Sequence, residues 1–168
     1  MARTYEKIVS TTLGSAAADV TFNSINSTYT DLVLVSSILG VTSQSYSPRV
    51  RFNSDTTSNY SVTYMYGTGS TTGTGRGSDA SFAYIGHLIG YPVTGSPMTI
   101  ITQIQNYSNT NVYKTLVSRS NNINTDIDAI VGMWRSNSAI TSINIAFQSG
   151  TNFQAGSTFS IYGIKKAV

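Results

Sequence analysis

The fold class of this chain is decided by the stretch Asp31-Leu32-Val33-Leu34-Val35-Ser36-Ser37-Ile38. It contains four consecutive apolar residues, and a short apolar run of this kind is typical of a central strand with both faces covered. Further along, Val50 and Phe52 alternate with Arg49 and Arg51, which is the period of a strand with one buried face. These patterns predict strands rather than helices.

The same alternation recurs along the whole chain, and polar turns separate the segments. Strand-like segments cover residues 5–12, 19–22, 31–38, 49–53, 60–66, 83–89, 98–105, 111–119, 127–135, 139–147 and 157–164. About ten short antiparallel strands at this spacing are typical of a sandwich or jelly roll. We therefore predict an all-β protein, a jelly-roll-like antiparallel β-sandwich, with one domain over residues 1–168.

Composition supports this prediction and excludes several classes of protein. The 168 residues include 25 Ser, 23 Thr, 13 Asn and a single glutamate, and charged residues are only 10% of the chain, against about 25% in an average protein. A hydrophobic content of 40% with a net charge of +3 excludes a disordered chain. There is no cysteine, so disulfides and Cys-ligated zinc are excluded.

Two segments stand apart from the strand pattern. Residues 67–78 contain five glycines and no apolar side chain, so we expect an exposed loop there. Phosphate binding by this segment is not favoured, because it contains no lysine and no helical pattern follows it. Residues 1–7 are expected to form an N-terminal arm. They have no apolar core of a signal peptide, and no stretch of the chain is apolar enough to span a membrane.

Residues that could carry chemistry are few. His87 is the only histidine, and no Gly-x-Ser-x-Gly motif offers it a nucleophile. Asn124, Asp126 and Asp128 are weak candidates for a calcium site, because Ca²⁺ prefers oxygen ligands. Asn53, Asp55 and Asn59 form a second such cluster.

Turn formation by Asx side chains is the favoured interpretation of both oxygen-rich clusters. We therefore predict no catalytic residue, no cofactor and no metal, and no enzymatic activity. A polysaccharide hydrolase that uses Asp126 or Asp128 remains an alternative, since a glycosidase needs two carboxylates across a cleft.

The surface is expected to be neutral and suited to protein contacts. Strand faces rich in Ser, Thr and Asn have a smaller desolvation cost than charged faces when another protein covers them. The ten basic residues are dispersed, too far apart to supply the roughly 6–10 phosphate contacts of nonspecific nucleic-acid binding. The eleven tyrosines could stack on sugars, or they could be ordinary half-buried strand residues.

Three motifs give a resemblance to a known group of proteins. They are Thr28-Tyr29-Thr30-Asp31-Leu32-Val33-Leu34-Val35, the block from Arg51-Phe52-Asn53-Ser54-Asp55 to Asn59-Tyr60-Ser61, and Phe153-Gln154-Ala155-Gly156-Ser157-Thr158-Phe159-Ser160-Ile161-Tyr162-Gly163-Ile164. Together they span most of the chain, and the third is the most distinctive. With them the chain resembles small all-β virion proteins of tailed bacteriophages, particularly phages of marine bacteria.

The resemblance implies a non-enzymatic structural protein located in the virion after synthesis in the host cytoplasm. A head decoration (cement) protein is favoured over a tail or fibre-associated module that binds a receptor or carbohydrate. The implied partners are the major capsid protein and further copies of the chain, as a trimer or dimer, with no nucleic acid or membrane. The residues we expect to contact partners are Arg3, Tyr5, Arg49, Arg51, Tyr60, Gly69, Gly73 and Arg76.

Overall fold

The computed structural model describes residues 4–40, 47–86, 97–121 and 126–165. These residues form twelve strands and no helix, as the sequence predicts. The strands are β1 (Tyr5–Thr12), β2 (Asp19–Phe22), β3 (Asp31–Ile38), β4 (Pro48–Phe52), β5 (Tyr60–Gly67), β6 (Thr72–Ala80), β7 (Ala83–Tyr84), β8 (Met98–Gln105), β9 (Lys114–Asn121), β10 (Ile127–Trp134), β11 (Ile143–Phe147) and β12 (Thr158–Ile164).

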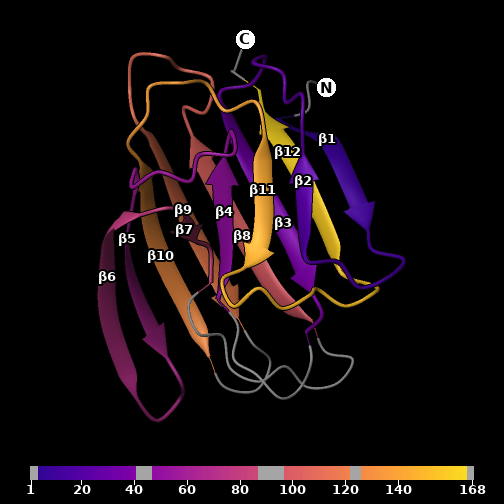
Figure 1. The fold of residues 1–168 in the computed structure, drawn as a ribbon, viewed down its shortest axis with the longest axis vertical. Helices are drawn as coiled ribbons and strands as arrows, with labels where there is room; N and C mark the ends of the chain where they lie inside the picture. The colour runs from indigo at the N-terminus through magenta and orange to yellow at the C-terminus, as the bar shows by residue number, and fades with distance from the viewer. Residues whose placement is uncertain (1–3, 41–46, 87–96, 122–125, 166–168) are drawn as a thin grey trace.

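The strands form two antiparallel sheets packed face to face (Figure 1). The larger sheet has eight strands in the order β1-β12-β3-β8-β9-β10-β5-β6, and the smaller has four in the order β2-β11-β4-β7. The pairs β1 and β2, β3 and β4, β7 and β8, and β11 and β12 each cross from one sheet to the other. This is the connectivity of a jelly roll, which confirms the predicted fold class.

Four strands are additional to this jelly roll, and they lengthen only one sheet. The hairpin β5–β6 lies between β4 and β7 in the chain, and the hairpin β9–β10 lies between β8 and β11. In the larger sheet, β9 pairs with β8, and β5 pairs with β10, so both hairpins extend the sheet on the β8 side. Of the smaller sheet, β7 is the strand that contacts β10 and β5. The larger sheet therefore extends past the smaller one (Figure 1).

The core lies between the sheets and follows the alternation in the sequence. On β3, Leu32, Leu34 and Ile38 are fully buried, and burial of each such side chain contributes about 1.5–3 kcal/mol. Phe153 packs against Phe147 and Phe159, with ring centroids 4.6 and 5.0 Å apart. The expectation that both faces of β3 are covered is wrong for this chain alone, because Val33 and Val35 point outward and are only half-buried.

The prediction of a loop at residues 67–78 is also wrong, because residues 72–80 form the edge strand β6. Gly73 and Gly75 pair with Tyr66 and Tyr64, and a Cβ atom at either glycine would overlap the tyrosine ring. The glycines thus leave room for two aromatic rings across the strand. Gly69, at φ +81°, forms the tight turn before β6, in which the Thr68 N–H donates to the Thr71 carbonyl at 2.9 Å.

The N-terminal arm is shorter than expected, because Tyr5 and Lys7 belong to β1 and pair with Ile164 and Tyr162 of β12. Residues 1–3 lie outside the described residues. Across the described ranges, no helix is long and apolar enough to cross a membrane.

Candidate interaction surface

The outer face of the larger sheet exposes apolar side chains on β5, β9 and β10. Val131 lies opposite Val117, and the two are 57% and 46% exposed. Met65 lies opposite Ala129 and is 60% exposed, and Ile127 is 67% exposed. We call these five residues the apolar strip. Since soluble monomers rarely expose large contiguous apolar patches, a strip of this kind marks a candidate contact surface.

The strip arises because β10 is apolar on both of its faces. Ile130 and Trp134 point inward and are buried. Ile127, Ala129 and Val131 occupy the alternate positions and point outward. No strand of the smaller sheet can cover this outer face, because the smaller sheet packs on the other side.

Open hollows lie along the strip. One of about 650 Å³ is lined by Met65, Ile127 and the threonines of β6. Another, of about 380 Å³, lies beside Val131 and Arg76, and one of about 330 Å³ lies between Ile101 and Arg119. The face is therefore uneven and can receive side chains from a partner.

The charge on this part of the sheet is sparse and positive. Arg119 lies between Ile101 and Ala129, and Arg76 lies opposite Thr63 on β5. Apart from Asp79 near the end of β6, which is paired with Arg135, they are the charged side chains at the outward positions of β5, β6, β8, β9 and β10. A partner that covered the strip would desolvate few charges, and acidic groups on its rim would complement the two arginines.

Toward the other end of the sheet the same face is rich in hydroxyl groups, with Lys7 and Asp31 as charged residues at its far end. Thr12, Thr158, Ser37 and Thr99 form one row across β1, β12, β3 and β8. This row agrees with the neutral strand faces predicted from composition.

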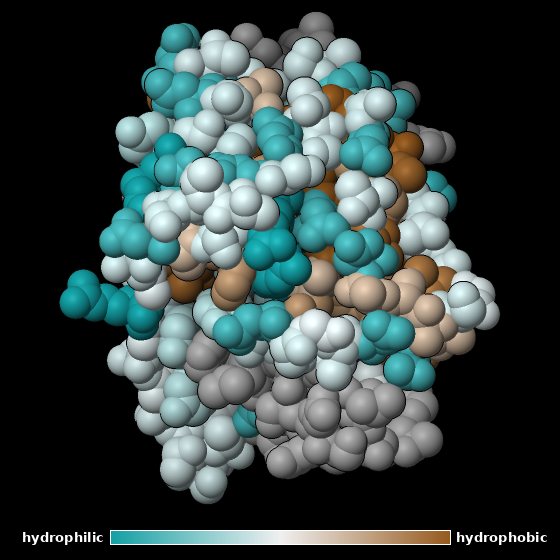
Figure 2. Space-filling model, viewed as in Figure 1, coloured by the Kyte–Doolittle hydropathy of each residue, from teal (hydrophilic) through white to brown (hydrophobic). Residues whose placement is uncertain are grey.

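The outer face of the smaller sheet carries Arg49 and Arg51, and it is mainly hydrophilic (Figure 2). The Arg49 guanidinium lies 5.7 Å from the Phe82 ring centroid. Burial, together with the nearby Arg51 charge, lowers the pKa of Arg49. Arg51 donates from Nε to the Ser81 carbonyl at 2.9 Å. Both arginines already bind within the chain, and they lie on the opposite layer from Arg76.

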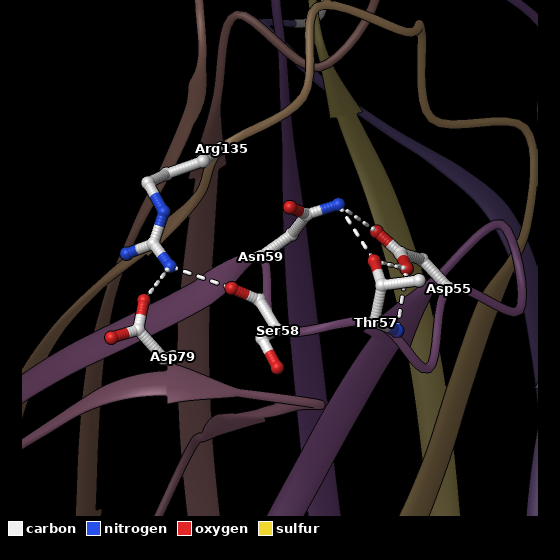
Figure 3. Close-up of polar contacts among 6 residues, drawn as sticks. All are labelled: Asp55, Thr57, Ser58, Asn59, Asp79 and Arg135. Carbon is white, nitrogen blue, oxygen red and sulfur yellow. Dashed lines mark hydrogen bonds and ion pairs between the residues drawn. The ribbon is translucent and has the colours of Figure 1, made fainter.

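A hydrogen-bonded turn joins β4 to β5 (Figure 3). The Asp55 carboxylate accepts hydrogen bonds from the Thr57 backbone at 2.9 Å, from Asn59 Nδ2 at 2.9 Å and from Trp134 Nε1 at 2.7 Å. Partial burial alone would raise the pKa of Asp55, but these bonds and the Thr57 hydroxyl outweigh it and lower the pKa to about 2. The oxygens serve the turn, in agreement with the favoured interpretation.

Beside this turn, Arg135 ties the end of β6 to the start of β5 (Figure 3). Its Nη2 lies 2.6 Å from both Asp79 Oδ1 and the Ser58 carbonyl. Asp79 has φ +56°, where β6 departs from regular pairing with β5. The ion pair therefore holds an irregular strand end in place.

The other oxygen-rich cluster is only partly described. Asp128 is buried on the inner face of β10 and accepts a hydrogen bond from Ser120 Oγ at 3.0 Å. Asp126 precedes that strand, whereas Asn124 and His87 lie outside the described residues. Within the described ranges, no three His, Cys, Asp or Glu side chains gather as a metal site.

The residues predicted to contact partners do not form one surface. The prediction that Tyr60 contacts a partner is wrong, because Tyr60 is fully buried and its hydroxyl accepts a hydrogen bond from the Phe52 N–H at 2.9 Å. Tyr5 is 57% exposed on edge strand β1. Three of the predicted residues lie on the β5–β6 hairpin, namely Gly69, Gly73 and Arg76. Gly69 is in the turn, and Gly73 lies against the Tyr66 ring. Arg3 lies outside the described residues.

Sequence reasoning did not find the apolar strip. The only signal was the nearly continuous apolar character of residues 127–134, which does not by itself say which face is exposed.

The sequence matches no protein-family model, and no curated protein is significantly similar to it. The similarity to phage virion proteins therefore rests on the three motifs alone and stays a prediction.

Proposed function

We propose that this chain is a structural protein of a bacteriophage virion, and specifically a capsid decoration protein. It binds the outer surface of the head and bridges neighbouring major capsid subunits. The observation that carries the proposal is the exposed apolar strip on the larger sheet, on the same face as a row of uncharged hydroxyl side chains that cost little to desolvate.

The outward side chains of β3 add to this support. Val33 and Val35 belong to an apolar run typical of a strand covered on both sides, yet their outer face is half-exposed. A capsid subunit on this face would provide the second cover. The strip and these valines are separated by β8, so one partner can span them.

The disposition of the tyrosines favours this role over sugar binding. Tyr60 and Tyr107 are fully buried, and Tyr64 and Tyr66 lie against glycines of β6. Tyr5 and Tyr113 are the strongly exposed tyrosines among the described residues. Four strand spacings separate β1 from β9, or about 19 Å, so these two rings do not form one stacking platform.

Bridging requires no reactive group. Each copy would bury a patch of the size typical of specific contacts, about 1,600 Å² in total. Repetition over the shell would add avidity, so that a modest contact per copy still resists the outward pressure of packaged DNA.

The test is binding of the purified protein to expanded heads that lack it. We expect saturation at a fixed copy number per head and a rise in the temperature at which heads disrupt. Val131→Arg, which places a charge in the apolar strip, should reduce binding at least tenfold. Ser10→Arg adds the same charge on the same sheet face at β1, outside the strip, and should bind like the wild type.

Heads equally stable with and without the protein would reject the proposal. Equal binding of Val131→Arg and Ser10→Arg would remove the strip as the contact. The rival function, a tail-associated receptor-binding module, predicts hits on a glycan array and immunogold label on tails rather than heads.

A further inference from the structure

The two sheets have four edges, and three of them are poorly suited to accept another strand. β2 has four residues and β7 has two. β1 is longer, but its pairing is interrupted between Lys7 and Val9, and Glu6 forms a salt bridge with Lys165. Short strands, bulges and charges are the usual means by which proteins block edge pairing.

The fourth edge, β6, is neither short nor bulged over residues 72–77, and it carries a single charge there. β6 is nine residues long and contains no lysine or proline, and Arg76 is the only charge before Asp79. Its pairing with β5 is regular from Thr72 to Gly77. In the part of the chain that the structure describes, no strand pairs with its outer side.

The alternation of an antiparallel ladder tells which backbone groups of β6 point outward. Thr68 and Thr71 form a hydrogen-bonded pair at the turn, so the pairs at Gly73, Gly75 and Gly77 are also of the hydrogen-bonded kind. The N–H and carbonyl groups of the residues between them therefore point away from β5. These residues are Thr72, Thr74 and Arg76.

We propose that β6 pairs antiparallel with β6 of a second copy of this chain, about a two-fold axis at Thr74. The larger sheets of the two copies then form one continuous sheet. A second copy suits this edge because an antiparallel strand pair with the same residues on both sides is self-complementary.

Charge selects the position of the axis. With the axis at Thr74, Arg76 lies opposite Thr72 of the other copy, and the two Arg76 positions are four residues apart along the strand, or about 13 Å. That distance exceeds the Debye length of about 8 Å in physiological salt. An axis at Gly75 would bring the two arginines to about 7 Å, and an axis at Arg76 would place them directly opposite each other.

The shape of the molecule permits this contact. The β5–β6 hairpin forms the outer end of the larger sheet and projects past the other strands (Figure 1), so the bodies of two copies stay apart. The inner side of β6 carries glycines over residues 73, 75 and 77. A glycine-rich strand loses more backbone entropy on ordering than others, and pairing on its second side compensates for this.

Cysteine crosslinking tests the proposal directly, since the chain has no cysteine of its own. Thr74→Cys should form a covalent dimer on mild oxidation, because directly opposite Cα atoms lie about 5.5 Å apart, within disulfide range. Thr72→Cys and Arg76→Cys should each crosslink poorly alone, and the double variant should crosslink well. Thr12→Cys, exposed on edge strand β1, is the matched control and should stay monomeric.

A second variant separates pairing from folding. Thr74→Pro removes an outward N–H but no bond to β5, so it should abolish the concentration-dependent dimer in sedimentation while the melting temperature stays within about 3 °C. The proposal is overturned if Thr74→Cys crosslinks no better than Thr12→Cys, or if Arg76→Cys alone crosslinks best. It is also overturned if Thr74→Pro leaves the dimer intact.

This proposal goes beyond the capsid function and can fail separately from it. The dimer is measured in protein alone, whereas head binding is measured with Val131→Arg on the sheet face. A protein that stays monomeric but needs an intact β6 edge to bind heads would show that a capsid strand, not a second copy, occupies the edge.

Discussion

At the scale of single residues, Asp55 joins three parts of the molecule. Its carboxylate receives hydrogen bonds from the turn residues Thr57 and Asn59 and from Trp134 at the end of β10. The Trp134 ring also packs against Phe52 and Tyr60, with centroids 5.6 and 6.2 Å away. The turn is thereby attached to the aromatic part of the core.

Replacement of Asp55 by Asn should therefore destabilise the fold in a pH-dependent way. The folded pKa of about 2 lies below the ordinary 3.8, so the carboxylate stabilises the fold above pH 3.8 and this contribution is lost as the pH falls toward 2. We expect Asp55→Asn to lower the free energy of unfolding by about 1–2 kcal/mol at pH 7, after allowance for solvent screening. The difference from the wild type should shrink as the pH falls below about 4 and become small near pH 2.

Urea unfolding at several pH values measures this effect. Asp19→Asn removes an equal charge from an exposed position on β2 and serves as the control, with an expected change within about 0.5 kcal/mol. A constant difference between Asp55→Asn and the wild type from pH 7 to pH 2 would contradict the proposed role of the carboxylate charge.

Tyr60 gives a second prediction of pH dependence, in which stability is lost at high pH rather than at low pH. Burial raises the pKa of its phenol above the ordinary 10, so the folded state keeps the proton and stability is lost as the pH rises above 10. Tyr60→Phe leaves the Phe52 N–H without its acceptor, which costs about 1–3 kcal/mol at pH 7. Its stability should then fall less steeply than that of the wild type between pH 10 and about pH 11. Tyr113→Phe, at a side chain 51% exposed, is the control. It should change neither the unfolding free energy at pH 7 nor its fall between pH 10 and about pH 11.

At the scale of elements, the pairing of glycines with tyrosines decides whether β6 forms. A Cβ atom at Gly75 would overlap the ring of Tyr64, whereas one at Gly77 would lie 3.5 Å from Val62 Cγ2, an ordinary contact. Neither glycine has a positive φ, so the backbone itself accepts alanine at both positions. Only the space occupied by the aromatic ring distinguishes them.

Gly75→Ala should accordingly destabilise the hairpin, and Gly77→Ala should not. We expect Gly75→Ala to lower the unfolding free energy by about 1–2 kcal/mol, because the Tyr64 ring must move off the strand. Gly77→Ala should be neutral or stabilising by a few tenths of a kcal/mol, since alanine restricts the unfolded chain. Thermal unfolding of both variants checks this. Equal effects of the two substitutions would show that the position of the Tyr64 ring does not matter. When Gly75→Ala is combined with Tyr64→Ala, the cost of the alanine at position 75 should disappear.

The same pairing explains which elements could be predicted from the sequence. Strands such as β3 and β11 combine β-branched residues with a two-residue period, so local pattern and tertiary position agree. β6 has glycine at its inward positions and polar residues outside, a composition typical of loops. It is a strand because Tyr64 and Tyr66 of β5 supply the side chains that it lacks, and this is a tertiary contact that local pattern does not contain.

The candidate surface was harder to predict than the fold for a related reason. Alternation assigns residues to faces but does not say which face meets the core. Tyr60 and Val131 both occupy regular strand positions, and the structure buries the first and exposes the second. The difference follows from the number of strands in each sheet, which depends on long-range pairing.

At the scale of the whole molecule, the inequality of the sheets accounts for both proposed contacts. Eight strands pack against four. The smaller sheet therefore covers only part of the inner face of β9, β10, β5 and β6, the strands beyond β8. Their outer face retains the apolar strip, and their last strand retains an open edge. A net charge of +3 provides little repulsion against association through either surface.

Hydrogen exchange of the whole chain should reveal this asymmetry. β3 and β8 have strands on both sides and buried inner faces, so their amides should exchange only through large-scale unfolding. The β6 amides of Gly73, Gly75 and Gly77 are held from one side, and we expect their protection to be at least about a hundredfold lower. At low protein concentration the Thr74 amide, like those of Thr72 and Arg76, should exchange faster than the glycine amides of β6, because it points away from β5. If the β6 edges pair, its exchange should slow as the concentration rises while that of β3 stays constant. Uniform protection across the larger sheet would instead mean that β6 is as firmly held as the centre, and the physical basis for edge pairing would be lost.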